Sequence, residues 1–164
     1  MKKSSILFAL CLFTLSGTAQ IRIYKSDPQK NITLDKPVDS LTLIADFGRP
    51  IEYETFYDDE YHNGQVANYK YIDFSLTCVD NLFVSFNIRG VGYYVQILDK
   101  HTVRIGDSIE ELIRKFSAQE AWFKQRVKQI LLFCKIKGMD YFTDFPLVFE
   151  YGSDGKITSI WQTN

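Results

Sequence analysis

The chain has 164 residues and carries 19 lysines and arginines against 20 aspartates and glutamates. This near balance argues against nucleic acid or an anionic membrane surface as the main partner, because both select for a clear excess of basic side chains. The 145 residues after position 19 are enough for one domain with its own hydrophobic core.

The first 19 residues have the order of a secretory signal peptide. Lys2 and Lys3 precede an apolar run from Ile6 to Leu15, and small and polar residues follow as far as Ala19. The apolar run is too short to remain in a bilayer as a spanning helix. We therefore expect cleavage after Ala19, a periplasmic or secreted mature protein, and no stable membrane insertion.

A first helix is predicted between Pro37 and Gly48. Pro37 suits the first helical position, and Gly48 followed by Pro50 would end the helix. The spacing of the apolar residues predicts that one side of this helix is buried. That side consists of Val38, Leu41, Ile44, Ala45 and Phe47.

The next segment, 51–64, has five acidic and four aromatic side chains. Its simplest interpretation is an acidic hairpin tip that follows a strand. A calcium loop starting at Asp59 is a second interpretation, but Tyr61 occupies its third position and Lys70 stands where the closing glutamate belongs.

A third interpretation makes the same segment a surface that binds another protein, and it suits an exported protein better than a cation site does. An exposed tyrosine offers a large, rigid contact area with a polar tip, and the neighbouring carboxylates add charge. The predicted contact residues are Tyr53, Tyr57, Asp58, Asp59, Glu60 and Tyr61.

Alternation of polar and apolar residues predicts strands after each helix. The predicted strands are 69–78, 82–88, 93–98, 129–137, 147–151 and 156–161. The buried face of the first would consist of Ile72, Phe74, Leu76 and Cys78. Asp80 and Asn81 form a two-residue turn into the second strand, and Gly155 lies in the turn of the last hairpin.

The stretch 103–116 predicts a second helix. Its apolar residues have the i, i+3, i+4, i+7 spacing that places them on one helical face. They are Ile109, Leu112, Ile113 and Phe116. Asp107 or Ser108 would cap the free amide groups of the first turn.

The tripeptide Gly106-Asp107-Ser108 also occurs around the nucleophile of the GDS-type serine hydrolases. A serine nucleophile needs a base, usually histidine, to accept its proton, and those hydrolases keep that histidine downstream. Here His62 and His101 both precede Ser108. We therefore expect Ser108 to cap a helix and the protein to have no enzymatic activity.

Three basic residues, Lys124, Arg126 and Lys128, alternate along one segment. They would share one face of a strand or fan over one side of a helix, and either arrangement is typical of a solvated surface. The sequence shows no zinc-binding spacing, no glycine-rich phosphate loop and no pattern of stacking aromatics. We expect no metal, no cofactor and no nucleic acid partner.

Cys78 and Cys134 both lie on the apolar side of predicted strands. In an oxidising compartment they could form a disulfide, whereas a buried free cysteine packs as a small hydrophobic residue. Both alternatives stay open at this point, because a disulfide depends on the distance between the two backbones.

The predicted elements follow the order helix, then antiparallel strands, twice. This order predicts an α+β fold in which short helices pack on one face of an antiparallel sheet, within a single domain covering 20–164. The two helix-then-strands units would be pseudo-repeats covering about 31–98 and 103–161. A single α+β domain without a repeat is the alternative.

The residues around both helices resemble a family pattern. Ile105-Gly106-Asp107-Ser108-Ile109 resembles the start of the helix in exported bacterial domains of the BamE (SmpA/OmlA) type, and Phe47-Gly48-Arg49-Pro50 resembles its end. The β-lactamase inhibitory protein type looks like two such units in tandem. The resemblance implies a non-enzymatic envelope protein that binds other proteins through its sheet or loops.

These observations predict an exported, non-enzymatic protein-binding or scaffold module of the bacterial cell envelope, whose partner is an envelope or secreted protein. An inhibitor or immunity-type protein that blocks a secreted enzyme is the first alternative. A serine hydrolase that uses Ser108 is the second.

Overall fold

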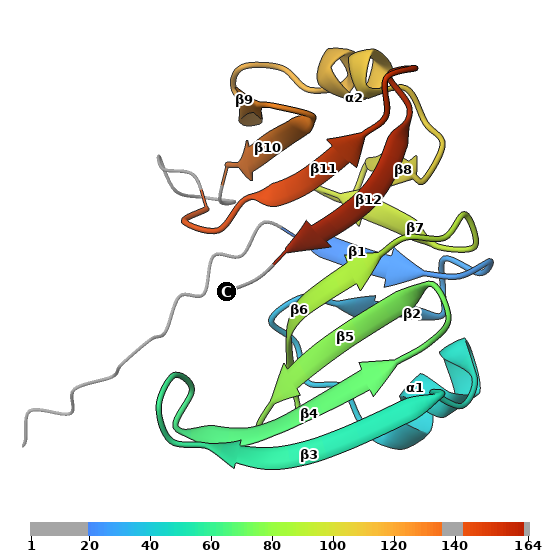
Figure 1. The fold of residues 1–164 in the computed structure, drawn as a ribbon, viewed down its shortest axis with the longest axis vertical. Coiled ribbons are helices and arrows are strands. Elements are labelled where there is room, and N and C mark those ends of the chain that lie inside the picture. Colours follow the sequence, from blue (N-terminus) through green and yellow to red (C-terminus); the bar gives the residue numbers. More distant parts are fainter. Residues whose placement is uncertain (1–19, 136–142, 163–164) are drawn as a thin grey trace, which may run out of the picture.

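The structure is a computed structural model that describes residues 20–135 and 143–162. Within these residues the chain forms two antiparallel sheets and two short helices, and far more residues lie in strands than in helices (Figure 1). The predicted signal peptide lies outside the described residues. No helix of the described part is long and apolar enough to cross a membrane.

The larger sheet has eight strands in the order β3-β4-β5-β6-β12-β11-β10-β9. Their bounds are β3 Glu52–Asp58, β4 Gly64–Lys70, β5 Phe74–Val79, β6 Leu82–Ile88, β9 Ala121–Arg126, β10 Gln129–Cys134, β11 Leu147–Tyr151 and β12 Ile157–Gln162. Each strand pairs antiparallel with its neighbour, and β6 joins β12 through pairs such as Ile88 with Ile160. The two halves of the chain therefore share one continuous sheet.

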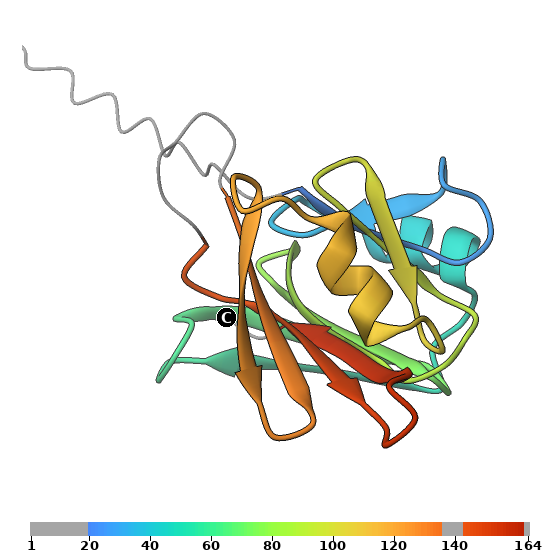
Figure 2. The ribbon, with the colours of Figure 1, turned by 90° about the horizontal axis from the view of Figure 1, so that it is seen from above.

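The smaller sheet and both helices lie on the same side of the large, curved sheet (Figure 2). The small sheet has the order β2-β1-β7-β8. The bounds are β1 Ile21–Tyr24, β2 Asn31–Thr33, α1 Ser40–Phe47, β7 Tyr94–Ile97, β8 His101–Arg104 and α2 Ile109–Lys115. The α+β class is confirmed in this β-rich form, but the second sheet was not predicted.

The hydrophobic core fills the space between these two layers. The large sheet contributes fully buried side chains from both halves of the chain, and the small sheet and helices cover them. From the large sheet these are Phe83, Ile88, Leu132, Phe149 and Ile160; from the other layer they are Ile23, Leu43, Ile97 and Leu112. Burial of this apolar surface is the main force that holds the two layers together.

The first helix differs from its prediction at its start and in its buried face. It begins at Ser40 after the N-cap Asp39, whereas Pro37 forms a β-bridge instead of the first helical turn. The helix buries Leu43 and Phe47, and the predicted core residue Leu41 is 77% exposed. In a helix of only eight residues with apolar side chains on several sides, tertiary packing selects the buried face.

The second helix agrees with its prediction in its start and in most of its buried face, but the predicted core residue Ile113 is 38% exposed. It begins after the N-cap Ser108, whose side chain accepts a hydrogen bond from the backbone N–H of Glu111. Ile109 and Leu112 are buried against the core, and Phe116 follows directly as the C-cap. Apart from Ile113, polar residues occupy its other sides, which favours burial of the face with Ile109 and Leu112.

The predicted strand 69–78 is interrupted by a tight turn. The backbone N–H of Tyr71 donates to the carbonyl of Phe74 at 2.7 Å, so the chain reverses and Ile72 is 85% exposed. The predicted turn at Asp80 and Asn81 is confirmed, with both residues in the left-handed region at φ 47° and 66°. The predicted hairpin around Gly155 is confirmed as well.

The order of elements in the first half is repeated in the second. The sequence β1-β2-α1-β3-β4-β5-β6 has the same order as β7-β8-α2-β9-β10-β11-β12, and β1 pairs with β7 just as β6 pairs with β12. These halves begin at Ile21 and Tyr94, earlier than the predicted units. A duplication of an ancestral unit stays a prediction.

Candidate functional site

The strand β3 forms one edge of the large sheet and is accessible on both of its faces. It pairs only with β4, from Glu52 with Lys70 to Asp58 with Gly64. Six of its seven residues are exposed and the seventh is half-buried. An edge strand of this kind presents unpaired backbone N–H and C=O groups to any strand that approaches it.

The two faces of β3 carry different side chains. Successive side chains of a strand point to opposite faces, so one face carries charge and the other carries hydroxyl groups. The outer face, turned away from the helices, has Glu52, Glu54, Phe56 and Asp58. The inner face has Tyr53, Thr55 and Tyr57.

The turn between β3 and β4 is held by its own polar side chains. Asp58 Oδ1 accepts hydrogen bonds from the backbone N–H groups of Glu60 at 3.0 Å and Tyr61 at 3.1 Å. The hydroxyl of Tyr57 donates to Asn63 Oδ1 at 3.0 Å, and Asn63 adopts a left-handed backbone with φ 47°. These contacts give the tip a defined shape and leave the ring of Tyr61 79% exposed.

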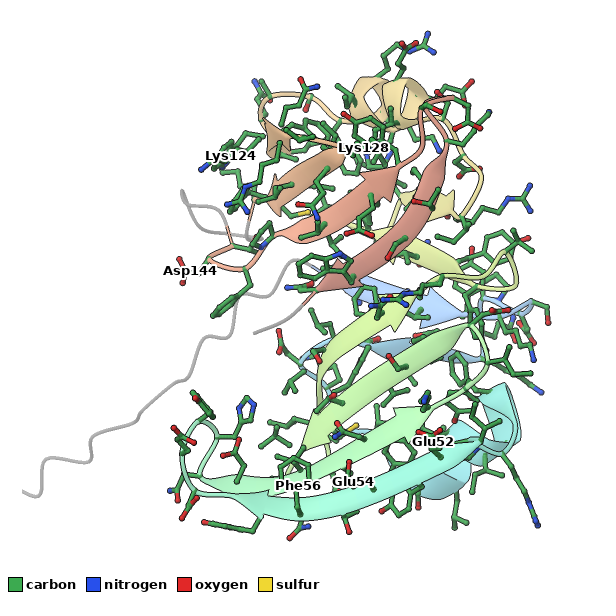
Figure 3. The ribbon with its side chains drawn as sticks, viewed as in Figure 1. Glu52, Glu54, Phe56, Lys124, Lys128 and Asp144 are labelled. Atoms are coloured by element: carbon green, nitrogen blue, oxygen red, sulfur yellow. The ribbon has the colours of Figure 1, made fainter. Side chains whose placement is uncertain are left out.

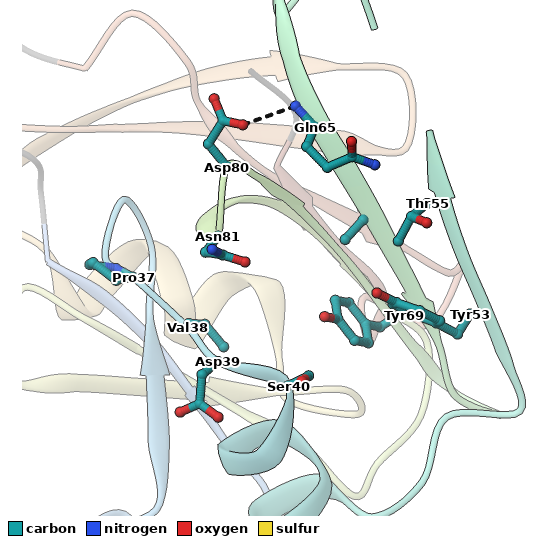
Figure 4. A pocket seen from close by; sticks show the side chains of 11 residues that line it. Pro37, Val38, Asp39, Ser40, Tyr53, Thr55, Gln65, Tyr69, Asp80 and Asn81 are labelled. Carbon is teal, nitrogen blue, oxygen red and sulfur yellow. Dashed lines mark hydrogen bonds between the residues drawn. The ribbon is translucent and has the colours of Figure 1, made fainter. Parts of the chain in front are cut away.

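A groove of about 630 Å³ lies beneath the inner face of β3 (Figure 4). One wall is formed by Tyr53 and Tyr69, whose rings pack with centroids 4.9 Å apart, together with Thr55. The other wall is formed by residues 37–40 at the start of α1 and by the turn between β5 and β6. Figure 1 shows that the β3–β4 hairpin extends past α1.

Both carboxylates that line this groove accept hydrogen bonds from neighbouring groups. Asp39 caps α1, and its hydrogen bonds with the hydroxyl and backbone of Thr42 lower the pKa of its carboxyl group. Asp80 Oδ1 accepts a hydrogen bond from the backbone N–H of Gln65 at 2.9 Å. Burial and the neighbouring Tyr53 raise the pKa of Tyr69 to about 12. The hydroxyl of Tyr69 therefore stays protonated at neutral pH, and the groove offers hydroxyl groups and ring surface to a ligand.

The structure brings the predicted contact residues together on one hairpin. Tyr53, Tyr57 and Tyr61 are 57%, 61% and 79% exposed, as the sequence predicted. They do not share one face, however, because Tyr53 and Tyr57 face the groove side while Tyr61 lies in the turn. Asp59 and Glu60 are exposed at the tip, and the carboxylate of Asp58 stabilises the turn.

The basic segment that was predicted as a solvated surface lies at the opposite edge of the same sheet. Lys124 and Arg126 belong to the edge strand β9, and Lys128 is in the turn that follows. Both strand residues are exposed. Figure 3 shows Glu52 and Glu54 at one end of the molecule and Lys124 at the other. Sequence spacing could not reveal that these two charged segments are the two edges of one sheet.

One row of directly paired residues crosses all eight strands of the large sheet. Direct partners on neighbouring strands lie on the same face. The row runs Glu52, Lys70, Ser75, Asn87, Trp161, Val148, Leu131 and Lys124. The acidic side chains of β3 and the basic side chains of β9 therefore point to the same outer face.

An aromatic pair on β9 and β10 was missed by the sequence analysis. The rings of Trp122 and Phe133 stack with centroids 4.2 Å apart and planes 4° from parallel. Trp122 is 42% exposed on the outer face, next to Lys124. In the sequence, Trp122 alternates with the basic residues Lys124 and Arg126, which indicates that the three share one face. Only the strand pairing reveals that Phe133 is the partner of Trp122.

Ser108 occupies the N-cap of α2 and also bridges to Lys156. His101 packs against the ring of Phe116 and lies 3.8 Å from the carboxylate of Glu120. His62 is on the β3–β4 turn, 4.0 Å from Asp58. Within the described residues, no hydrogen bond or ion pair joins Ser108 to either histidine.

Cys78 on β5 and Cys134 on β10 are buried free thiols in the structure. Burial raises the pKa of Cys78 to about 11 and that of Cys134 to about 12. Both therefore stay protonated at neutral pH and pack as small hydrophobic side chains. No group of three or more metal-ligating side chains gathers anywhere in 20–135 or 143–162.

Comparison with known proteins gives one distant structural likeness. No family model matches the chain, and no curated protein matches it. A solved structure described as an extracellular protein containing an SCP domain, from Bacillus anthracis str. Ames, is similar with a TM-score of 0.42 and 14% identity. The match covers 79% of this chain and 44% of the solved chain, so this chain spans less than half of that protein.

The predicted resemblance to the BamE type and to the β-lactamase inhibitory protein type is wrong. No family model matches the chain, and the structure adds a second, four-stranded sheet that the family pattern did not predict. The motif match depended on fewer than ten residues around two helix ends. Short helix caps of this kind recur in unrelated folds, because any helix start and end needs them.

Proposed function

We propose that this chain is an exported, non-enzymatic module that binds another protein through the β3–β4 hairpin. One observation carries the proposal: β3 is an edge strand exposed on both faces, and it continues into a turn with an exposed tyrosine. Export is proposed from the signal-peptide pattern of the first 19 residues.

The physical character of the hairpin supports a protein ligand. A free strand edge can form a ladder of backbone hydrogen bonds with an added strand, and side-chain positions on alternating faces then select the partner. Tyrosine rings contribute large contact areas at a small cost in conformational entropy. Natural proteins commonly protect free edges with charged side chains, above all lysine, or with proline or a bulge; β3, with the sequence EYETFYD, has no proline and no bulge, and its charges are all acidic.

Site-specific photocrosslinking in cells tests this proposal. A photoreactive amino acid at Tyr61 should crosslink a defined protein partner. The same amino acid at Ile72 is the matched control, because Ile72 is 85% exposed in the turn at the other end of β4. The Tyr57→Ala/Tyr61→Ala variant should then lose at least about tenfold in affinity for the purified partner.

Tyr61→Ala alone should retain its thermal stability, since an exposed side chain without contacts contributes within about 0.5 kcal/mol; the double variant should lose only about 1 kcal/mol more, because Tyr57 donates one exposed hydrogen bond to Asn63. Equal crosslinking from Tyr61 and Ile72 would contradict the proposal. Unfolding of the double variant would show instead that the two rings have a structural role.

A further inference from the structure

We infer that the partner of the β3 edge is a second copy of this chain, which contributes its β9 edge so that the sheet continues from one molecule into the next. This inference rests on the proposed function, because it names the partner of the same strand. The two edges are complementary in three respects: their charges are opposite, their strands run in opposite directions, and the side chains of their outer faces match in spacing.

Strand direction is the first argument. All eight strands of the large sheet pair antiparallel with their neighbours, and the number of strands is even. The two edge strands therefore run in opposite directions. A second copy placed beside β3 with its outer face on the same side brings β9 antiparallel to β3, and antiparallel strands form a regular hydrogen-bonded ladder.

Side-chain register is the second argument. Three outer-face residues of β9, spaced by two, match three outer-face residues of β3 when Lys124 is placed opposite Glu54. The same register places Arg126 opposite Glu52. It also places Trp122 opposite Phe56, and both rings are exposed, at 42% and 43%. Opposite charges and aromatic pairs directly across two strands stabilise their pairing.

The charged residues of this register are available for the contact. Within the described residues Glu54, Lys124 and Arg126 form no ion pair. Both carboxylate oxygens of Glu52 accept hydrogen bonds from Lys70 on the neighbouring strand, at 2.9 and 2.8 Å, and each oxygen can accept a further hydrogen bond from an arginine. All four side chains point to the outer face, so no core packing has to change.

Charge also excludes the two symmetric alternatives. A pairing of β3 with β3 would bring Glu52, Glu54 and Asp58 of one copy beside the same residues of the other. A pairing of β9 with β9 would bring Lys124 and Arg126 together. Like charges placed across an interface disfavour it strongly, so only the unlike pairing of edges is complementary.

The expected association is weak and directional. One added strand is smaller than the interfaces of stable complexes, and its exposed ion pairs are screened by salt, with a Debye length of about 8 Å at 0.15 M. The contact uses two different surfaces, so it produces head-to-tail chains instead of a closed dimer.

Sedimentation velocity over about 10 µM to 1 mM protein tests the inference with the mature chain. The wild type should show a mean mass that rises continuously with concentration at about 20 mM salt and falls at about 500 mM salt. Glu54→Lys alone and Lys124→Glu alone should each associate at least about tenfold more weakly. The chain that carries both substitutions should associate as the wild type does, because its two edges are again opposite in charge.

Lys25→Glu is the matched control, since it makes the same charge change as Lys124→Glu at an exposed position outside both edges. A wild type that stays monomeric over the whole range, or a dimer that is unaffected by Lys124→Glu, would overturn the inference. A monomeric protein that still crosslinks a different partner from Tyr61 would leave the proposed function standing and remove only this inference.

Discussion

The two edges of the large sheet are built differently, although each is a single strand that carries charge on its outer face. The inner face of β9 belongs to the core: Ala121 is 3% exposed, and the ring of Phe123 meets that of Phe116 edge to face at 5.9 Å. The inner face of β3 lies over a groove, where Tyr53 contacts Tyr69 and is still 57% exposed. The inner face of β9 therefore packs against the core, whereas the inner face of β3 stays accessible to a ligand.

The largest expected difference between the two edges is in stability. Phe116→Ala should destabilise the protein by about 3 kcal/mol, because it leaves a cavity beneath β9 that the surrounding helix and strand cannot fill. Tyr53→Ala, on the inner face of β3 itself, should cost only about 1 kcal/mol, because its ring is still 57% exposed. Urea unfolding of both variants, followed by circular dichroism, measures the difference. Equal losses would show that the groove beneath β3 is as well packed as the core.

The caps of the two helices offer a smaller comparison. Asp39 accepts from two backbone N–H groups, at 2.8 and 3.0 Å, whereas Ser108 accepts from one at 3.5 Å. Asp39→Ala should therefore lower the urea midpoint more than Ser108→Ala does, because it leaves two helix donors without their acceptor. A larger loss from Ser108→Ala would indicate a role for this hydroxyl beyond the cap.

The smallest expected effect on stability comes from the carboxylate of Glu120, just before β9. A hydrogen bond from Lys100, joined by hydrogen bonds from the backbone and hydroxyl of Ser117, lowers the pKa of Glu120 from its usual 4.5 to about 2. A lowered pKa stabilises the folded state above pH 4.5, and this contribution is lost as the pH falls from 4.5 through 2. Solvent screening at this partly exposed site keeps the effect small.

Glu120→Gln provides the measurement for this last prediction. The variant should be less stable than the wild type at pH 7, and the difference in urea midpoint should shrink as the pH is lowered toward 2. Lys25→Glu again serves as a charge change remote from the site. A difference in urea midpoint that stays constant from pH 7 to pH 3 would contradict this prediction, because protonation of Glu120 should remove its stabilising contribution.

Local sequence patterns correctly predicted the elements whose conformation is set by residues close in the sequence. The second helix has one apolar face and a capping serine, and the turn at Asp80 and Asn81 uses two residues that tolerate a left-handed backbone. The buried face of the first helix was predicted only in part, because its apolar residues surround the helix. Phe47 packs among the rings of Tyr71, Phe74 and Tyr93 as predicted, but Leu43 is buried in place of Leu41.

The sequence predicted which residues belong to the candidate site, but it did not predict how they are arranged in space. Exposed tyrosines among carboxylates could be recognised from the sequence alone, since their density on one segment is unusual. Their distribution over two faces and a turn depends on the register of β3 with β4. The acidic and basic segments are the two edges of one sheet because β6 pairs with β12. This pairing joins residues more than 70 positions apart, so local patterns could not predict it.

The sequence by itself therefore determined the second helix, the tight hairpin turns and a segment rich in tyrosine and acid, because each depends on contacts within a few residues. The tertiary structure alone decided which helix face is buried, which strands lie at the edges and that a second sheet covers the first. Those features depend on long-range strand pairing, whose energy comes from burying a shared core that no short segment can form.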